Sequence, residues 1–230
     1  MAVIGILALQ GDFEAHARAL LRLGVRPLRP ADELPRPPVS LRPPAPGGGD
    51  RYLFVRDAGE LSRADALILP GGESTTMLKF LEDEEFWRAL GEFVRHKPAF
   101  GTCAGAILLA REAGPPAQRS LGVLDAAARR NAYGRQRESS IRCGSWGVNG
   151  SSELEMVFIR APILDAIGPG VEVLARAGGA PVLVRQGRVL AATFHPELTG
   201  DLRVHEMFLA MAHAAVAEAG RGGSGKVASS

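Results

Sequence analysis

The sequence predicts an α/β fold of three layers, in which helices cover both faces of a mixed, mostly parallel central sheet. In the first half of the chain, short apolar runs alternate with segments of helical periodicity, an order typical of parallel strands joined by helices. The runs are continuously apolar, as in strands covered on both faces. The second half is richer in strands and contains a candidate hairpin, which predicts antiparallel pairs in the same sheet.

Strand–helix units follow one another through the first half. Residues 3–9 predict a buried strand, Gly11 and Asp12 predict a turn with Asp12 as helix N-cap, and a helix then runs to a stop at Gly24. The later elements show the same alternation. Strands are predicted at residues 52–55, 66–69 and 99–100, and helices at residues 74–81, at 84–95 and from 104 onward.

Residues 27–50 interrupt this alternation. Eight prolines fall in the stretch, and three consecutive glycines close it. Proline has no N–H to donate to a helix or a sheet. We therefore expect an exposed insertion, partly polyproline-like, that contributes little to the core.

The second half predicts four strands, a hairpin and a closing helix. The strands are placed at residues 155–159, 171–175, 181–184 and 189–194. Gln186-Gly187 is the expected hairpin turn between the last two strands, and residues 204–211 show helical periodicity. Residues 220–230 are rich in glycine and serine and predict a disordered tail. Residues 1–219 are expected to form a single domain.

Composition and charge argue against several classes of protein. The formal net charge is +2, too small to predict binding to nucleic acid or to an anionic membrane surface. No apolar run approaches the ~20 residues that a membrane-spanning helix needs. The two cysteines, Cys103 and Cys143, are too few for a disulfide-rich secreted scaffold. A nucleophilic thiol needs a reducing compartment, so we expect a cytoplasmic protein.

A G-x-C-x-G turn carries the strongest chemical signal. Residues 101–105 follow a predicted strand and lead into a predicted helix, so the dipole of that helix favours the thiolate form of Cys103. Gly101 and Gly105 fit a sharp elbow in which a Cβ would crowd the neighbouring strand and helix. The N–H of Ala104 faces the place where an oxyanion would form. The alternative is a small buried cysteine in a glycine-rich turn.

His195-Pro196-Glu197 follows the last apolar run. His195 is placed to accept the proton of a thiol and return it to a leaving amine, and Glu197 to hold the imidazole in one tautomer. Alone, the tripeptide fits a surface turn equally well. Together with the elbow it predicts a Cys-His-acid nucleophile.

Gly71-Gly72-Glu73-Ser74 is a third candidate, between a predicted strand and a predicted helix. The N–H of Gly72 can serve as a second oxyanion donor, or the motif is a plain turn with Ser74 as helix cap. It lacks the Gly-Lys-Ser/Thr ending of a phosphate-binding loop. Cys143 has no acid–base partner nearby in the sequence, so we interpret it as a packed or exposed thiol without a catalytic role. Arg129, Arg130 and Arg160 either meet a carboxylate or carry surface charge.

The remaining histidines lie in predicted helices, without metal-ligand spacing. We interpret them as solvated or capping residues, and we predict neither a metal nor a cofactor. These histidines are His16, His96, His205 and His213.

Taken together, the motifs resemble the glutaminase subunit of pyridoxal 5′-phosphate synthase, the PdxT/SNO family of class I glutamine amidotransferases, whose fold is flavodoxin-like. The elbow and His-x-Glu alone indicate only a class I amidotransferase, and the remaining strings narrow the resemblance to this branch. It rests on residues 7–11 (Leu-Ala-Leu-Gln-Gly), 67–76 (Leu-Ile-Leu-Pro-Gly-Gly-Glu-Ser-Thr-Thr), 101–105, 130–136 (Arg-Asn-Ala-Tyr-Gly-Arg-Gln), 158–162 (Phe-Ile-Arg-Ala-Pro) and 193–199 (Thr-Phe-His-Pro-Glu-Leu-Thr).

The resemblance implies a reaction. Cys103 attacks the side-chain amide of L-glutamine to form a glutamyl thioester, His195 protonates the departing ammonia and then activates water, and Glu197 orients His195. Gly72 and Ala104 supply the oxyanion donors. The residues implied to contact glutamine are Gly72, Glu73, Ser74, Arg130, Ile159 and Arg160.

The resemblance also implies a partner. Ammonia passes through a tunnel to a (β/α)8 synthase subunit of the PdxS/SNZ type, which condenses a pentose phosphate and a triose phosphate into the cofactor. The glutaminase is weakly active until the synthase docks and reorders the turn at residues 70–72, and twelve copies of each subunit assemble. Two stretches depart from the family pattern, the insertion at 27–50 and residues 138–153.

Two other functions are compatible with such a chain. A thiol hydrolase of the DJ-1/PfpI group has the same kind of fold, but many members carry histidine directly after the cysteine, where this chain has Ala104. A binding subunit without activity would lack at least one of Cys103, His195 and Glu197, and all three are present.

Overall fold

Thirteen strands and six α-helices are defined in the parts of the chain that the computed structural model describes, residues 1–34, 49–130, 139–147 and 152–223. The strands are β1 (Val3–Leu7), β2 (Arg26–Pro27), β3 (Arg51–Val55), β4 (Ala66–Leu69), β5 (Ala99–Thr102), β6 (Ala110–Gly114), β7 (Leu124–Arg129), β8 (Ser139–Trp146), β9 (Ser152–Ile159), β10 (Ile163–Asp165), β11 (Glu172–Ala177), β12 (Ala180–Gln186) and β13 (Val189–Ala192). The helices are α1 (Phe13–Arg22), α2 (Ala58–Ser62), α3 (Ser74–Phe80), α4 (Glu84–His96), α5 (Ala104–Leu109) and α6 (Arg203–Gly223), with short 3₁₀ turns η1 (Pro30–Asp32) and η3 (Pro196–Leu198).

A ten-stranded sheet runs through the molecule in the order β2-β3-β1-β4-β5-β13-β12-β11-β8-β9. From β2 to β13 every neighbouring pair is parallel, and from β13 to β9 every pair is antiparallel. A second, three-stranded sheet has the order β10-β7-β6. The predicted mixed sheet is therefore confirmed, with its parallel part formed mainly by the first half of the chain.

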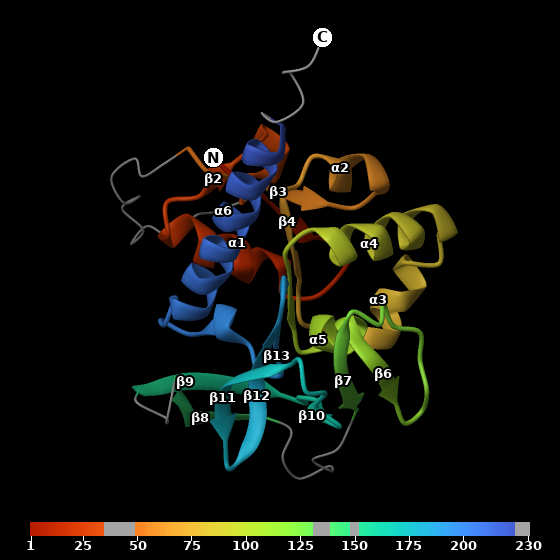
Figure 1. Cartoon of the computed structure of the whole chain (residues 1–230), viewed down its shortest axis with the longest axis vertical. Helices are drawn as coiled ribbons and strands as arrows, with labels where there is room; N and C mark the ends of the chain where they lie inside the picture. The colour runs from red at the N-terminus through yellow and green to blue at the C-terminus, as the bar shows by residue number, and fades with distance from the viewer. Residues whose placement is uncertain (35–48, 131–138, 148–151, 224–230) are drawn as a thin grey trace.

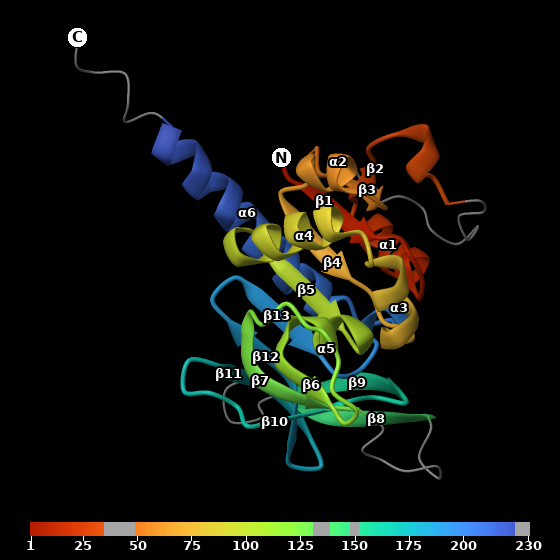
Figure 2. The ribbon, with the colours of Figure 1, turned by 90° about the vertical axis from the view of Figure 1, so that its right-hand side faces the viewer.

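Helices cover both faces of the parallel part, which gives the three predicted layers (Figures 1 and 2). α1 and α6 lie on one face, and α2 to α5 lie on the other. The alternation of side chains along each strand explains this arrangement. In β4, Ile68 packs in the cluster that includes α1 and α6, whereas Leu67 and Leu69 pack in the cluster that includes α4 and α5. Continuous apolar runs are thus required because both faces are buried.

Residues 27–34, the described start of the predicted insertion, pack against the domain. Pro27 belongs to β2, the N–H of Leu28 donates to the carbonyl of Tyr52, and Leu34 is buried. Asp32 is fully buried and accepts hydrogen bonds from Arg29 and from the N–H of Phe54. The expectation of little burial is therefore wrong for residues 27–34, because proline is tolerated in an edge strand and at the start of a 3₁₀ turn. Residues 35–48 lie outside the described part of the chain.

The second half holds elements that periodicity did not predict. The three-stranded sheet and β8 were missed, whereas the hairpin of β12 and β13 is confirmed, with Gly187 at a φ of 55° in its turn. α6 continues to Gly223, so the predicted disorder is wrong for residues 220–223. Residues 224–230 are not described. Within the described residues, no helix combines the length and apolar character that crossing a membrane requires.

Candidate active site

Four adjacent parallel strands bring the catalytic candidates and the turn after β4 to one edge of the sheet. The strands β1, β4, β5 and β13 are consecutive in the sheet. The carboxyl ends of parallel strands meet at the same edge. Asp12 follows β1, residues 71–74 follow β4, Cys103 follows β5, and His195 follows β13. Thr102 pairs with Ala192 in the register of β5 and β13. Cys103 and His195 therefore leave neighbouring strands on the same side of the molecule.

Cys103 occupies a strained elbow between β5 and α5. Its backbone has a φ of 46° and a ψ of −101°, a region that costs a residue other than glycine about 1–3 kcal/mol. The N–H of Cys103 donates to Ala192 at 2.8 Å, which ties the elbow to the strand that carries His195. A Cβ on Gly101 would lie 2.5 Å from the backbone of Gly105, and a Cβ on Gly105 would lie 2.0 Å from the carbonyl oxygen of Leu69. A side chain at either position would therefore clash with the neighbouring helix or strand, as predicted.

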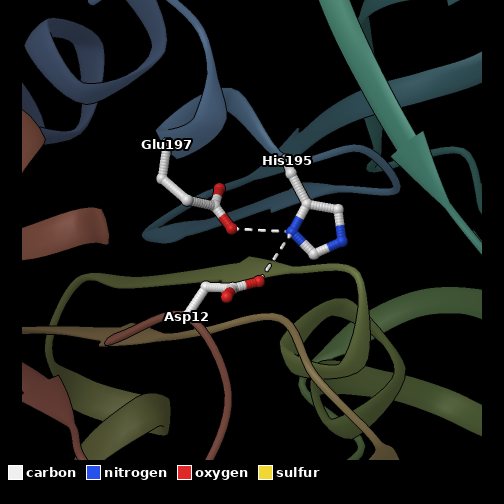
Figure 3. Close-up of side chains that lie close together, drawn as sticks. All are labelled: Asp12, His195 and Glu197. Carbon is white, nitrogen blue, oxygen red and sulfur yellow. Dashed lines mark hydrogen bonds and ion pairs between the residues drawn. The ribbon is translucent and has the colours of Figure 1, made fainter. Parts of the chain in front are cut away.

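His195 and Glu197 form a buried hydrogen-bonded pair (Figure 3). The Nδ1 atom of His195 lies 2.7 Å from Oε1 of Glu197, and η3 turns the chain so that both side chains face inward. The N–H of His195 also donates to the carbonyl of Val157 in β9 at 2.8 Å. Oε1 of an ionised carboxylate only accepts, so Nδ1 carries the proton. This leaves the Nε2 atom of His195 free to exchange a proton with another group.

Burial and hydrogen bonding act in opposite directions on His195. Burial alone lowers the pKa of His195, but hydrogen bonding with Cys103 and Glu197 outweighs it and raises that pKa to about 10. Burial also raises the pKa of Glu197, against the hydrogen bond from His195. The 2.7 Å contact requires one shared proton, and we place it on His195. Nε2 has no partner of full hydrogen-bond geometry among the described residues, although Cys103 is near enough to affect the pKa of the ring.

Asp12 is a site residue that the sequence did not reveal. It precedes α1 as predicted, but its side chain makes no capping hydrogen bond. Instead Oδ2 lies 3.6 Å from Nδ1 of His195 (Figure 3), and the N–H of Asp12 donates to the carbonyl of Gly71 at 3.2 Å. Asp12, His195 and Glu197 have the spacing of a metal site, because the atoms with which they could bind an ion lie within 4.8 Å of one another. Nδ1 is protonated toward Glu197, which leaves it no lone pair for a metal ion.

The turn after β4 packs against the imidazole. A Cβ on Gly71 would lie 2.3 Å from Cε1 of His195, so only glycine allows the ring to approach this turn. Gly72 has a φ of +146°, a conformation that residues with a Cβ rarely adopt. The Gly-Gly pair is therefore required for close approach and for backbone shape.

A pocket beside Cys103 collects most of the residues predicted to contact substrate. It is lined by Gly72, Glu73, Ser74, Cys103, Ile107, Arg130, Arg160 and Pro162. Ile159 lies outside this lining, but its carbonyl oxygen accepts from Sγ of Cys103 at 3.8 Å. Ala104 begins α5, is buried, and is not part of this lining. Residues 131–136, the rest of the motif that starts at Arg130, are not described.

The pocket carries charges of both signs. Arg130 lies 3.6 Å from Glu73, and hydrogen bonds from Thr75 and Thr76 lower the pKa of Glu73 to about 2. Arg160 has a φ of 45°, so its backbone, like that of Cys103, is strained. Strain of this kind tends to persist at functional sites, where surrounding structure holds it in place.

The sequence as a whole matches the family model of the SNO glutamine amidotransferase family over residues 6–214. The chain belongs to this family. It is 52% identical over 208 residues to a pyridoxal 5′-phosphate synthase subunit PdxT of Koribacter versatilis, covering 90% of this chain and 94% of the relative. It is 48% identical over 213 residues to a protein of that name from Thermus thermophilus, covering 91% and 97%.

Solved structures give the same assignment. A crystal structure of a glutamine amidotransferase, 44% identical in sequence, matches with a TM-score of 0.75 and covers 91% of this chain and 98% of that one. The structure of PurLQS from Thermotoga maritima matches with a TM-score of 0.59 at 15% identity, covering 91% and 98%. The latter supports the fold alone. The predicted class I amidotransferase fold is confirmed, and this member of the SNO family is an amidotransferase rather than a DJ-1/PfpI-type hydrolase.

Four further polar residues surround the site in this SNO family chain. Gln10 accepts from the N–H of Glu73 at 3.3 Å, and Gln118 accepts from the hydroxyl of Ser74 at 3.1 Å. His16 and His205 are fully buried, so their interpretation as solvated or capping residues is wrong. Both lie on the apolar faces of their helices, one turn from the buried Leu20 and Phe208. That position was the available signal.

Proposed function

We propose that this chain hydrolyses L-glutamine to L-glutamate and ammonia through Cys103, His195 and Glu197, and delivers ammonia to a synthase subunit that makes pyridoxal 5′-phosphate. The observation that carries the proposal is the strained elbow of Cys103 beside the buried His195–Glu197 pair. A thiol, a base and a carboxylate in this order are the parts of a Cys-His-acid nucleophile.

The first half-reaction forms a thioester. Nε2 of His195 takes the thiol proton of Cys103, the thiolate sulfur attacks the side-chain amide carbon of glutamine, and the carbonyl oxygen gains the negative charge. N–H groups of Gly72 and Ala104 are the proposed donors to that oxyanion. The intermediate collapses as the C–N bond breaks, and His195 gives its Nε2 proton to the nitrogen, which leaves as ammonia.

The second half-reaction releases glutamate. Neutral His195 takes a proton from water through Nε2 while the water oxygen attacks the thioester carbon. The C–S bond then breaks, and the sulfur leaves as the thiolate beside protonated His195. Glu197 keeps the proton of Nδ1 in place throughout, which holds Nε2 toward the sulfur.

Substrate recognition follows from the charges in the pocket. Free glutamine carries an α-carboxylate and an α-ammonium group. Arg130 and Arg160 line the pocket with Glu73, and guanidinium and carboxylate groups complement these two charges. Ser74 and the carbonyl of Ile159 are the remaining proposed contacts. A peptide-bound glutamine lacks both α-charges, so the pocket favours the free amino acid.

The partner is proposed from the names of relatives and from the family resemblance. Relatives over 40% identical are named as subunits of pyridoxal 5′-phosphate synthase, which supports a complex with a synthase of the (β/α)8 PdxS/SNZ type. Assembly with twelve copies of each subunit, activation on docking and an ammonia tunnel complete the proposal.

Glutaminase activity with and without the synthase subunit tests this function. We expect glutamate release that rises when the synthase is added, and intact-mass detection of a glutamyl adduct on Cys103. Cys103→Ala should abolish turnover and still co-purify with the synthase. Cys143→Ala is the matched control, because Cys143 is exposed and free, and it should retain wild-type turnover. Turnover by Cys103→Ala, or an adduct on Cys143, would contradict the assignment.

A further inference from the structure

Behind Glu197, on the side away from His195, lies a buried pair of histidines. We propose that His16 is a positioning residue for the nucleophile, and that His205 holds it in the tautomer whose Nε2–H faces Glu197. The inference rests on the proposed function for its consequences in catalysis, but the arrangement itself can be measured without activity.

Contacts place His16 between the two halves of the catalytic group. Its Nε2 atom lies 3.5 Å from Oε2 of Glu197 and 3.1 Å from the hydroxyl oxygen of Thr102. Thr102 directly precedes Cys103, so His16 touches the backbone segment of the nucleophile as well as the carboxylate. Its Nδ1 atom lies 3.0 Å from Nε2 of His205. A single side chain of α1 thus joins β5, η3 and α6.

Only one neutral tautomer of His16 turns an N–H toward the carboxylate. If His16 carried its proton on Nδ1, its Nε2 lone pair would face Oε2 of Glu197, a buried oxygen that has no hydrogen-bond partner among the described residues, because His16 at 3.5 Å lies near it without full hydrogen-bond geometry. Two facing lone pairs repel, and a buried carboxylate oxygen left without a donor costs about 1–3 kcal/mol. If His205 donates from Nε2 to Nδ1 of His16, then His16 presents Nε2–H to Glu197 and Thr102.

The same arrangement places the remaining unpaired atom where it costs least. Nδ1 of His205 has no partner in the described part of the chain. In the proposed tautomer this atom is an unprotonated nitrogen rather than an N–H donor. Under-satisfied acceptors are more easily tolerated in proteins than orphaned N–H groups. The choice that favours Glu197 also favours His205.

Both histidines are held neutral. Burial, followed by the charges of His205 and His195, keeps the pKa of His16 well below its usual value. Burial and the charge of Arg22 lower the pKa of His205 to about 4. The titratable groups that face this pair are therefore Glu197 from η3, His195, and Arg22 from α1 itself, while Asp12 acts on Glu197.

Neutrality matters for the reaction. A charged His16 would compete with His195 for the negative charge of Glu197. A neutral N–H donor instead fixes the orientation of the carboxylate and leaves its charge to stabilise the His195 imidazolium. His16 and His205 thus position Glu197 without taking part in proton transfer.

Nitrogen-15 NMR of the full chain, labelled at histidine, tests the arrangement directly. We expect His16 and His205 to show neutral rings protonated at Nε2 at pH 7. The ring signals of each histidine are assigned by their disappearance in His16→Gln and in His205→Gln. A ring of His16 that is protonated at Nδ1, or charged, would overturn the proposal. This result does not depend on turnover, so it stands apart from any failure of the proposed glutaminase activity.

A pair of conservative variants tests the role in catalysis, assayed in complex with the synthase. The amide nitrogen of His16→Gln reaches the place of Nε2, whereas that of His16→Asn reaches only the place of Nδ1. We expect His16→Asn to lower kcat by about tenfold to a hundredfold at an unchanged KM, because the N–H that faces the charged carboxylate is lost. The acid limb of the pH–activity profile of His16→Asn should move to higher pH, since Glu197 then holds a proton more readily.

His16→Gln should restore kcat to within about threefold of the wild type, together with the wild-type pH profile, since a difference of that size is under 1 kcal/mol. His96→Leu, on the exposed side of α4, is the control and should leave activity unchanged. Equal loss in His16→Gln and His16→Asn, or a change confined to KM, would show that His16 serves packing alone and would overturn the proposal.

Discussion

Glu197 has a histidine on each side, and the two behave in opposite ways. His195 and His16 are both buried, yet the pKa of His195 is raised to about 10 while that of His16 is held well below its usual value. Nδ1 of His195 lies 2.7 Å from one carboxylate oxygen. Nε2 of His16 lies 3.5 Å from the other. The comparison shows that burial penalises the charged form of both rings. The groups around each ring then decide whether it carries a second proton.

The partners on the two sides differ in charge. His195 faces Glu197, the thiol of Cys103 and, at 3.6 Å, Asp12, so an imidazolium there is stabilised by groups that carry or acquire negative charge. His16 lies farther from the shared carboxylate, and its hydrogen-bond partners are another histidine and a threonine hydroxyl, neither of which carries negative charge. One side of Glu197 is therefore suited to proton transfer and the other to holding the carboxylate in place.

Removal of the charge that both histidines share should have the largest effect. In Glu197→Gln, His195 loses the carboxylate that raises its pKa, and the amide can present its N–H to Nδ1, which favours the wrong tautomer. We expect kcat for glutamine to fall by about 10³–10⁴ and the pKa of His195 to fall, with little change in His16. Steady-state kinetics with the synthase and a histidine NMR titration measure both.

Glu155→Gln on β9 provides the control for that substitution. Glu155 is exposed, so this variant should keep the wild-type kcat. The assigned role of Glu197 would be wrong if Glu197→Gln retained a tenth or more of wild-type kcat, since loss of the carboxylate predicts a far larger drop.

Another buried carboxylate sharpens the comparison. Asp32 is as buried as Glu197 but pairs with a permanent cation, Arg29, at 2.8 Å. Burial raises its pKa, but hydrogen bonds from Arg29 and Phe54 outweigh burial and lower it. Asp32→Asn should therefore reduce the free energy of unfolding by about 2 kcal/mol, because hydrogen bonds to a charged group are lost while Arg29 keeps Glu60 as a partner, and leave kcat unchanged. Urea denaturation measures the loss, and a loss below about 1 kcal/mol, the size of an exposed pair, would refute the structural role.

The same pair shows where proline counting fails. Eight prolines in residues 27–50 predicted an insertion outside the core, but Pro30 starts the 3₁₀ turn that brings Asp32 to Arg29. Composition does not reveal which proline is followed by a residue with a buried partner. The contact between Asp32 and Phe54 spans 22 residues, and no local pattern encodes it.

Elsewhere the sequence predicts the fold well for a physical reason. Parallel strands covered on both faces are continuous apolar runs, so β1, β3, β4 and β5 were predictable. β8 alternates exposed and partly buried residues and contains Arg142, so it resembles a polar loop. The pairing of β8 with β9 and β11 depends on contacts distant in the chain, which periodicity does not contain.

The site divides in the same way. Cys103, His195 and Glu197 lie in short motifs whose chemistry is local, and the structure brings them to one edge. His16, His205 and Asp12 lie in ordinary helical or turn contexts. Helical periodicity places the two histidines on apolar faces, but the contacts that lead from His205 through His16 to Glu197 arise only because α1 and α6 pack on the same face of the sheet near η3.

Acid should weaken the fold through the neutral histidines. The folded-state pKa of His205 is lowered to about 4, whereas an unfolded histidine titrates near 6.5. The unfolded state therefore binds more protons below pH 6.5, and stability is lost as the pH falls toward 4. His195 acts oppositely. Its raised pKa gives stability that is fully present below pH 6.5 and is lost as the pH rises through about 10.

His205→Gln removes one of these groups while keeping a hydrogen-bond donor. Between pH 7 and pH 5, we expect the wild type to lose about 2 kcal/mol more of its unfolding free energy than His205→Gln does. Denaturant titrations at the two pH values measure this difference. Parallel losses in both proteins would mean that His205 is not held neutral in the folded state.

The smallest expected effect concerns the second carboxylate near His195. The side chain of Asp12 is 44% exposed and lies 3.6 Å from Nδ1 of His195, so water screens its charge, and its negative charge raises the pKa of Glu197. Asp12→Asn should change kcat by no more than about threefold, with a larger change at low ionic strength, because screening by salt is then weaker. Kinetics at two salt concentrations measure it. A loss as large as that of Glu197→Gln would instead make Asp12 the carboxylate that orients His195, and the two sides of Glu197 would no longer divide proton transfer from positioning.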